Sequence, residues 1–497
     1  MREAVIETGK IRGIACGWPS ITAFYGIPYA APPVGELRWR PPQPAAPWPG
    51  VRDCARPGPR CPQLGVGKGS FYEREFYPVE EPMDEDCLYL NVWTPAQSAG
   101  ERLPVIFWVH GGAFMTGYGH SAHFDGEPFA RQGVILVTIN YRLNIFGWMV
   151  HPELSAESDR HVSGNYGLLD QIFALEWVRR NIAALGGDPD NITVAGQSAG
   201  AMSVQALLTT PLTEGMVSKA IMQSGGGITA VPDMRFPSLE EAEARTDLSL
   251  LGISSIREAR ALSWQALLDR WISSMPAQGL QRTPVADGWV LPDSLDQMAR
   301  QGRHRQVPCL IGYTSREGIP AAPNYQLWRE LLEREYGPRQ AGTFAALCGG
   351  EKGFAAYSQE HFTLHCRAAA EAWALLLERQ GTGPAYVYCL NRQLPGDSMG
   401  PFHAADLWYV FQTLNRCWRP WEKEDYWLAR ACGTYWAQFA KTGVPQGDRL
   451  PEWTPYTRSD PRTMLLGADI GLTKLPPDPR VEFRKSFLLG EPPRAVN

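Results

Sequence analysis

The chain has 497 residues, a formal net charge of −5 and no clustered run of Lys and Arg. This mild acidic balance gives no electrostatic footprint for nucleic acid, and no basic cluster adjoins an apolar helix that could rest on a membrane. Hydrophobic residues make up 44% and charged residues 20%, which is ordinary for a folded protein with a large buried core.

The N-terminal residues 1–7 lack the apolar stretch of a signal peptide, and no apolar run reaches the length of a transmembrane helix. We therefore expect a cytoplasmic protein, with secretion left open for a chain whose leader has been removed. The 10 Cys are scattered, without a CxxC pair or zinc-ligand spacing, so neither a metal nor another cofactor is expected. The sequence makes no prediction of the oligomeric state.

Three continuous apolar runs, at residues 103–109, 134–140 and 191–196, have the length and β-branched content of strands buried on both faces of a parallel sheet. Between the second and third runs, residues 166–185 carry an apolar stripe at helical spacing that ends at Gly186-Gly187. Strand, helix and strand at these lengths predict a βαβ unit. No stretch has linker composition, so we expect a single α/β domain over residues 1–497.

The third run ends in Gly196-Gln197-Ser198-Ala199-Gly200, a G-x-S-x-G pattern followed by a helix-compatible segment. In this context the pattern predicts a tight strand-to-helix turn that exposes the hydroxyl of Ser198 above the sheet. The residues two positions either side of the Ser must then be small. A structural Gly-Ser turn without catalytic meaning is the alternative.

A Gly-rich loop, His-Gly-Gly-Ala-Phe at 110–114, follows the first run. Acyl transfer needs backbone N–H groups placed to receive the oxyanion that develops on the carbonyl oxygen. We expect these donors to come from Gly112, Ala113 and Ala199. A phosphate-binding loop is excluded, because no Lys-Ser/Thr pair follows the glycines.

Beyond these elements the sequence resembles the type-B carboxylesterases, the group that includes the cholinesterases, and in particular its bacterial esterases. The likeness covers nearly the whole chain and rests on several motifs in the same order. These are 24–30 (FYGIPYA), 85–92 (EDCLYLNV), 140–143 (NYRL), 164–171 (GNYGLLDQ), 186–189 (GGDP) and the turn around Ser198. The resemblance implies an α/β-hydrolase fold, in which helices flank a central, mostly parallel sheet and insertions, here roughly 60–85 and 230–400, cover the active site.

The resemblance also supplies the other two members of a catalytic triad. The segment 311–318 (IGYTSREG) resembles the one that carries the family's acid, and 400–407 (GPFHAADL) the one that carries its histidine. The implied triad is therefore Ser198, Glu317 and His403, in the chain order expected of α/β-hydrolases. Asp406 is the competing acid, although a residue three positions along cannot easily reach back across the imidazole ring.

The chain departs from the family pattern at two positions beside the site. Gln197 stands where many relatives have Glu, and its side chain is expected to point away from the reacting carbonyl. Ala113 stands where a third Gly is frequent; its N–H remains available if the residue can adopt the required backbone angles, and its methyl group is expected to narrow the acyl side of the pocket. Phe114 and Phe402 are expected to contact the substrate.

Cys61 and Cys87 fall where secreted relatives close a loop with a disulfide. For a protein that remains in the cytoplasm a reduced pair is equally compatible with the sequence. The loop between them is expected to overhang the pocket entrance.

These observations favour a serine hydrolase that cleaves a small-molecule carboxylic ester through an acyl-enzyme. Two alternatives remain: a catalytically silent binding protein on the same fold, and hydrolysis of an amide, thioester or lactone by the same residues. A silent relative typically lacks the nucleophile, whereas Ser198 is present here.

Overall fold

The computed structural model describes residues 1–77, 79–228, 236–275 and 282–491. The chain forms two compact units, and each takes several separate segments of the sequence. Unit 1 comprises Met1–Lys219, Phe236–Ser294 and Asn415–Trp418, and unit 2 comprises Ala220–Arg235, Leu295–Leu414 and Arg419–Asn497. A single domain over residues 1–497 stays a prediction.

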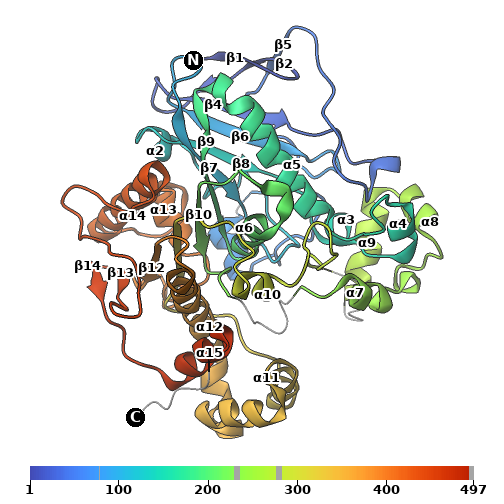
Figure 1. The fold of residues 1–497 in the computed structure, drawn as a ribbon. Coiled ribbons are helices and arrows are strands. Elements are labelled where there is room, and N and C mark those ends of the chain that lie inside the picture. Colours follow the sequence, from blue (N-terminus) through green and yellow to red (C-terminus); the bar gives the residue numbers. More distant parts are fainter. Residues whose placement is uncertain (78, 229–235, 276–281, 492–497) are drawn as a thin grey trace. The chain divides into compact units, whose positions relative to one another are not determined.

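Unit 1 contains a small sheet and a larger one (Figure 1). The small sheet has the order β1-β2-β5, and the strands of the larger sheet that lie in unit 1 have the order β9-β7-β8-β6-β4-β3. Their bounds are β1 Glu3–Ile6, β2 Gly9–Arg12, β3 Ile14–Ala15, β4 Thr22–Pro28, β5 Val51–Asp53, β6 Tyr89–Thr94, β7 Leu103–Val109, β8 Ile135–Ile139 and β9 Gly187–Gln197.

The helices of unit 1 are mostly short. They are α1 Phe71–Phe76, α2 Glu127–Ala130, α3 Asn144–Trp148, α4 Pro152–Glu157, α5 Tyr166–Asn181, α6 Ala199–Thr209, α7 Leu239–Arg245, α8 Ile256–Ala261 and α9 Trp264–Ser274. Helix α6 packs against β7 and β9, and α5 packs against β9. Helix α6, which begins directly after Ser198, therefore covers this part of the sheet, and all of its residues are buried.

The predicted βαβ unit is confirmed. The apolar runs at 103–109, 134–140 and 191–196 form β7, β8 and most of β9, and β7 lies between the other two with both of its pairings parallel. All five residues of β8 are buried, as expected of a strand covered on both faces. The predicted helical stripe forms α5 and a short 3₁₀ turn, Ile182–Leu185, which ends at Gly186 in the left-handed region with φ 86°.

Unit 2 contains parallel strands and the longest helices of the chain. The strand order is β14-β13-β12-β11-β10, parallel from β10 to β13 and antiparallel between β13 and β14. The elements are β10 Lys219–Gln223, α10 Leu295–Arg300, β11 Cys309–Thr314, α11 Tyr325–Leu347, α12 Gly350–Gln380, β12 Ala385–Leu390, α13 Asp406–Val410, α14 Lys423–Thr442, β13 Thr463–Leu466, β14 Ile470–Thr473 and α15 Pro479–Leu489.

Helix α12 packs against β11 and β12, and α15 packs against α12. Two stretches whose sequences have a helical pattern, 240–245 and 362–377, lie within α7 and α12. Among the helices of the described ranges, none is both long enough and apolar enough to span a bilayer.

Candidate functional site

The turn around Ser198 has the conformation that the G-x-S-x-G pattern predicts. Strand β9 ends at Gln197, helix α6 begins at Ala199, and Ser198 between them adopts φ 57° and ψ −125°. Positive φ costs an L-residue roughly 1–2 kcal/mol, so this conformation persists only because the flanking strand and helix impose it. Such strain is a common property of functional residues and is consistent with a nucleophile presented above a sheet.

The glycines on either side make this turn possible. A Cβ atom at Gly196 would lie 2.4 Å from the carbonyl oxygen of Gly200, and one at Gly200 would lie 2.1 Å from the carbonyl oxygen of Val109. Both distances are far below van der Waals contact, and both opposing atoms belong to the backbone. The expectation that these two positions must be small is therefore confirmed.

Three consecutive residues in the loop after β7 have positive φ angles: Gly112 (φ 108°), Ala113 (φ 55°) and Phe114 (φ 61°). Ala113 thus adopts a left-handed backbone conformation although it carries a Cβ atom. A Cβ atom at Gly111 would lie 3.1 Å from the Cβ of Ser198, so the loop runs directly beside the nucleophile. The same Cβ atom would lie 2.9 Å from Oε1 of Gln197, which puts the Gln197 side chain against Gly111.

Two carbonyl groups of this loop accept hydrogen bonds from neighbouring backbone N–H groups. The carbonyl of Gly112 accepts from the N–H groups of Met115 (2.9 Å) and Thr116 (3.0 Å), and the carbonyl of Phe114 accepts from the N–H of Asn144 (2.8 Å). Within the described part of the chain, by contrast, the N–H groups of Gly112, Ala113 and Ala199 donate no hydrogen bond. Three backbone donors in this loop and in the Ser198 turn therefore have unused bonding capacity.

In unit 2, Glu317 and His403 form a direct pair. Nδ1 of His403 lies 2.5 Å from Oε2 of Glu317, and the His403 N–H donates to the Glu317 carbonyl oxygen at 3.2 Å. The Glu317 side chain is fully buried, and its second oxygen accepts from the N–H of Thr314 at 2.8 Å. An imidazole that donates through Nδ1 to a carboxylate presents Nε2 as its proton acceptor.

Two residues of α12 complete the surroundings of this pair. The hydroxyl of Thr363 accepts from the Glu317 N–H at 2.9 Å, and the Phe362 ring meets the His403 ring edge-on, with centroids 5.5 Å apart. The sequence gives no signal that these two side chains support the pair. Only an alignment of relatives or the fold itself could have identified them.

Asp406, the competing acid, is bonded elsewhere. Its Oδ2 accepts from the Tyr388 hydroxyl at 2.7 Å and from Nε2 of Gln223 at 2.9 Å. Burial raises the pKa of Asp406 from its ordinary 3.8 to about 6, although both hydrogen bonds lower it. Of the two carboxylates, Glu317 is therefore the one bonded to the His403 ring.

Phe114 and Phe402 are both buried. The Phe114 ring packs edge-on against Trp148 and Phe236, with centroids 5.3 and 5.8 Å away, and the Arg419 guanidinium lies 5.3 Å from the centre of the Phe402 ring. Contact of either ring with a substrate stays a prediction.

Cys61 and Cys87 are both free and buried, and they lie close enough for a hydrogen bond between their thiols. That bond and the burial of the site raise the pKa of the Cys87 thiol well above its ordinary range. A disulfide between the two remains a prediction.

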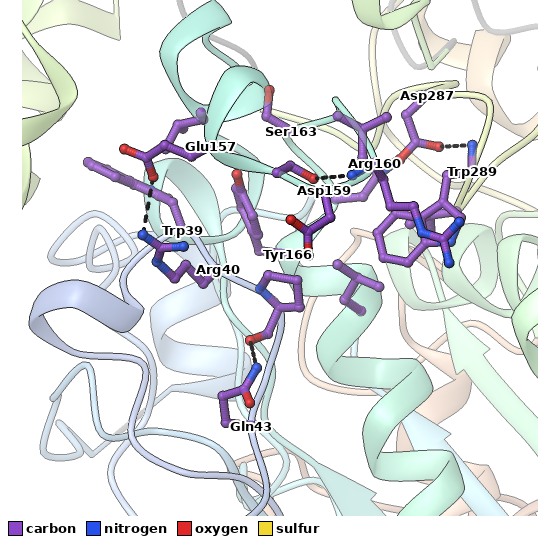
Figure 2. A pocket seen from close by; sticks show the side chains of 17 residues that line it. Trp39, Arg40, Gln43, Glu157, Asp159, Arg160, Ser163, Tyr166, Asp287 and Trp289 are labelled. Carbon is purple, nitrogen blue, oxygen red and sulfur yellow. Dashed lines mark hydrogen bonds and ion pairs between the residues drawn. The ribbon is translucent and has the colours of Figure 1, made fainter.

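A cavity of about 350 Å³ in unit 1 is a separate feature (Figure 2). Trp39 and Glu157 lie at one end of it and Asp287 and Trp289 at the other. Glu157 pairs with Arg40 at 3.5 Å, and Asp287 accepts from the N–H of Trp289 at 3.0 Å. None of the residues predicted for the catalytic site lines this cavity.

Comparisons with known proteins address the family as a whole. A model of the carboxylesterase family matches residues 2–336 and 351–483. The chain is 33% identical to a para-nitrobenzyl esterase of Bacillus subtilis over 525 aligned residues, covering 98% of this chain and 99% of that protein. It is 32% identical to a fumonisin B1 esterase of Sphingopyxis macrogoltabida over 489 residues, covering 94% of this chain and 86% of the relative.

Solved structures agree with these sequence matches. A thermophilic PNB esterase superimposes with a TM-score of 0.83 at 31% identity, covering 97% of this chain and 99% of that one. A second PNB esterase structure gives 0.82 at the same identity. With the motifs, the strand order and the Ser198 turn described above, these matches show that the chain belongs to the carboxylesterase family and has the α/β-hydrolase fold.

Proposed function

We propose that the protein hydrolyses carboxylic esters through an acyl-enzyme formed on Ser198. The observation that carries the proposal is the combination of the strained Ser198 backbone, φ 57°, with N–H groups of Gly112, Ala113 and Ala199 that donate no hydrogen bond within the described residues. A serine hydroxyl and an oxyanion hole together are what acyl transfer requires. The esterase activity named for both curated relatives supports the same reaction.

In the proposed first step, Nε2 of His403 takes the proton of the Ser198 hydroxyl while its oxygen attacks the ester carbonyl carbon. The negative charge moves to the carbonyl oxygen, which the three N–H groups stabilise. Collapse of this intermediate breaks the bond to the alcohol oxygen, which leaves with the proton held by His403. Water then attacks the acyl-enzyme with His403 as its base, and the carboxylic acid and free Ser198 result.

Glu317 is proposed as the acid of the triad. Its 2.5 Å contact with Nδ1 fixes the tautomer and orientation of His403, and its negative charge stabilises the imidazolium that forms in each step. Full burial of the carboxylate strengthens this interaction, because little solvent screens it.

The proposed substrates are neutral esters with a moderately large, apolar acyl or alcohol part. Position 197 contributes to this expectation, because an uncharged Gln beside the nucleophile offers no carboxylate to attract a cationic substrate. The amide, thioester and lactone alternatives use the same residues and are separated from ester cleavage by experiment.

A panel of p-nitrophenyl esters, measured beside the matching p-nitroanilides and thioesters, tests this proposal. We expect turnover of the esters with kcat/KM well above that of the anilides. Higher kcat/KM on anilides or thioesters would reassign the reaction, and a folded protein that turns over none of them would favour the silent binding protein.

We also propose that the protein is cytoplasmic, a location in which cysteines stay reduced. Thiol titration of the protein unfolded without reductant is expected to find all 10 cysteines reactive. A deficit of two, mapped to Cys61 and Cys87, would indicate folding in an oxidising compartment.

A further inference from the structure

The loop after β7, residues 110–117, brings its last residue, Gly117, back against its first two. This residue has φ 108°, and a Cβ atom on it would lie 2.4 Å from Nδ1 of His110 and 2.6 Å from the carbonyl oxygen of Gly111. The end of the loop is therefore pressed against its beginning. Gly112 and Ala113, which carry two of the three oxyanion donors, lie on the arc between these two points.

The Gln63 side chain hydrogen-bonds to the backbone of Gly117 on both sides. Its Oε1 accepts from the Gly117 N–H at 2.7 Å, and its Nε2 donates to the Gly117 carbonyl oxygen at 3.0 Å. The same Nε2 also donates to the Cys61 carbonyl oxygen at 2.9 Å, which ties the side chain to its own segment. Both polar groups of one peptide residue are thus held by a single side chain 54 positions earlier in the sequence.

An amide side chain is suited to this pair of bonds. Gly117 offers one donor and one acceptor, so its partner must accept and donate at neighbouring atoms, which Gln does and Glu in its ionised form does not. Gln63 is 3% exposed, so water cannot replace a lost bond without a change in the surrounding structure. Loss of either bond leaves a buried polar group unsatisfied, which is more costly than the bond itself is stabilising.

We propose that Gln63 is a positioning residue of the oxyanion hole. It holds Gly117 against His110 and thereby fixes the arc on which the N–H groups of Gly112 and Ala113 are presented. This role rests on the proposed function, because it matters for catalysis only if those N–H groups bind the oxyanion. Gln63 itself touches neither the substrate nor the reacting atoms.

The test compares Gln63→Ala and Gln63→Glu with the wild type. Donors that have lost their fixed positions stabilise the transition state less but bind the ground state much as before, so kcat falls while KM changes little. Removing one oxyanion donor outright costs about 10²–10³ in kcat, and a loosened loop is expected to cost about 10- to 100-fold. The affinity of a trifluoromethyl ketone, which forms a tetrahedral adduct with an active serine, should fall by a similar factor.

Asn181→Ala is the matched control. Asn181 is also a buried side-chain amide of unit 1 that bonds backbone on both sides: it accepts from the Glu7 N–H at 2.8 Å and donates to the Trp177 carbonyl at 2.9 Å. Its removal is expected to lower stability without changing kcat. Rates are expressed per active site titrated with a phosphonate, so that only folded molecules count. Gln63→Asn, whose amide is one methylene too short to reach both groups of Gly117, replaces any Gln63 variant that does not fold and is expected to lower kcat in the same way.

The proposal is overturned if the Gln63 variants keep wild-type kcat, if KM rises while kcat is unchanged, or if Asn181→Ala lowers kcat equally. These outcomes differ from a failure of the proposed function. In that case Ser198→Ala would retain turnover, and the ketone would bind wild type and Gln63 variants with equal affinity.

Discussion

The two halves of the proposed catalytic machinery are built in different ways. Around Ser198 the important atoms belong to the backbone: a strained turn, glycines that admit no Cβ, and N–H groups without acceptors. Around His403 they belong to side chains, where a buried carboxylate meets an imidazole across 86 positions of sequence. The first arrangement depends on residues adjacent in the chain, and the second depends on where the fold brings distant residues.

This difference predicts how each half responds to amino-acid substitution. A backbone-built site tolerates few substitutions at its glycines, because a Cβ atom meets other backbone atoms that cannot move aside. A side-chain pair can lose one partner and keep its fold, so that activity is lost and stability largely remains. The predictions below test this contrast, beginning with the largest expected effect.

Removal of the nucleophile should have the largest effect. Ser198→Ala is expected to lower kcat by about 10⁴-fold or more, because no other group can form the acyl-enzyme. The fold should persist, since alanine retains the Cβ that the turn already accommodates. A p-nitrophenyl ester assay and a thermal unfolding curve measure both properties. Turnover near that of the wild type would exclude Ser198 as the nucleophile.

The two carboxylates near His403 should differ in importance. Glu317→Gln is expected to lower kcat by about 10³–10⁴-fold, because an amide at this position favours the wrong imidazole tautomer. Asp406→Asn should cost far less activity, since Asp406 bonds Tyr388 and Gln223 and makes no hydrogen bond to the imidazole ring. The reverse ranking in the same assay would make Asp406 the acid.

The ionisation of Asp406 should instead change the free energy of unfolding with pH. Its pKa is about 6 in the fold and 3.8 ordinarily, so the folded state binds the proton more tightly than the unfolded state. The resulting stabilisation is fully present below about pH 4 and is lost as the pH rises to about 6, a difference of roughly 3 kcal/mol.

Asp406→Asn removes this dependence, because the amide does not titrate. The free energy of unfolding of the variant, relative to the wild type, should therefore increase between pH 4 and pH 7 in urea titrations. A difference that is constant over this range would show that Asp406 ionises normally in the fold.

The smallest effect is expected at Ala113. Its φ of 55° strains an alanine and suits a glycine, while glycine also adds entropy to the unfolded chain. Ala113→Gly should change stability by less than about 1 kcal/mol and leave kcat on acetate esters within about threefold. If its methyl narrows the acyl side of the pocket, kcat/KM on bulky acyl esters should rise. A loss of activity on all esters alike would place the methyl in a structural role instead.

The same contrast explains what the sequence could predict. Strand β7, the end of β9 and the Ser198 turn are encoded by contiguous residues, so their patterns could be interpreted without a structure. Glu317 and His403 carry no local pattern that pairs them, and only the resemblance to a family suggested both. Gln63 and Thr363 were missed altogether, because each acts through one contact with a residue far away in the sequence.

The division into two compact units was also not foreseen, since neither unit is a continuous segment and no linker composition marks their boundaries. Contacts between residues distant in sequence define such units, and hydrophobic periodicity does not record those contacts.

The most direct test of the account is covalent labelling with an organophosphonate that carries a chromogenic leaving group. Peptide mass spectrometry should find one phosphonyl group on Ser198, formed in step with the loss of activity, and none on the Ser198→Ala variant. Full inactivation with Ser198 unmodified, or labelling of another residue at the same rate, would contradict the assignment of Ser198 as the nucleophile.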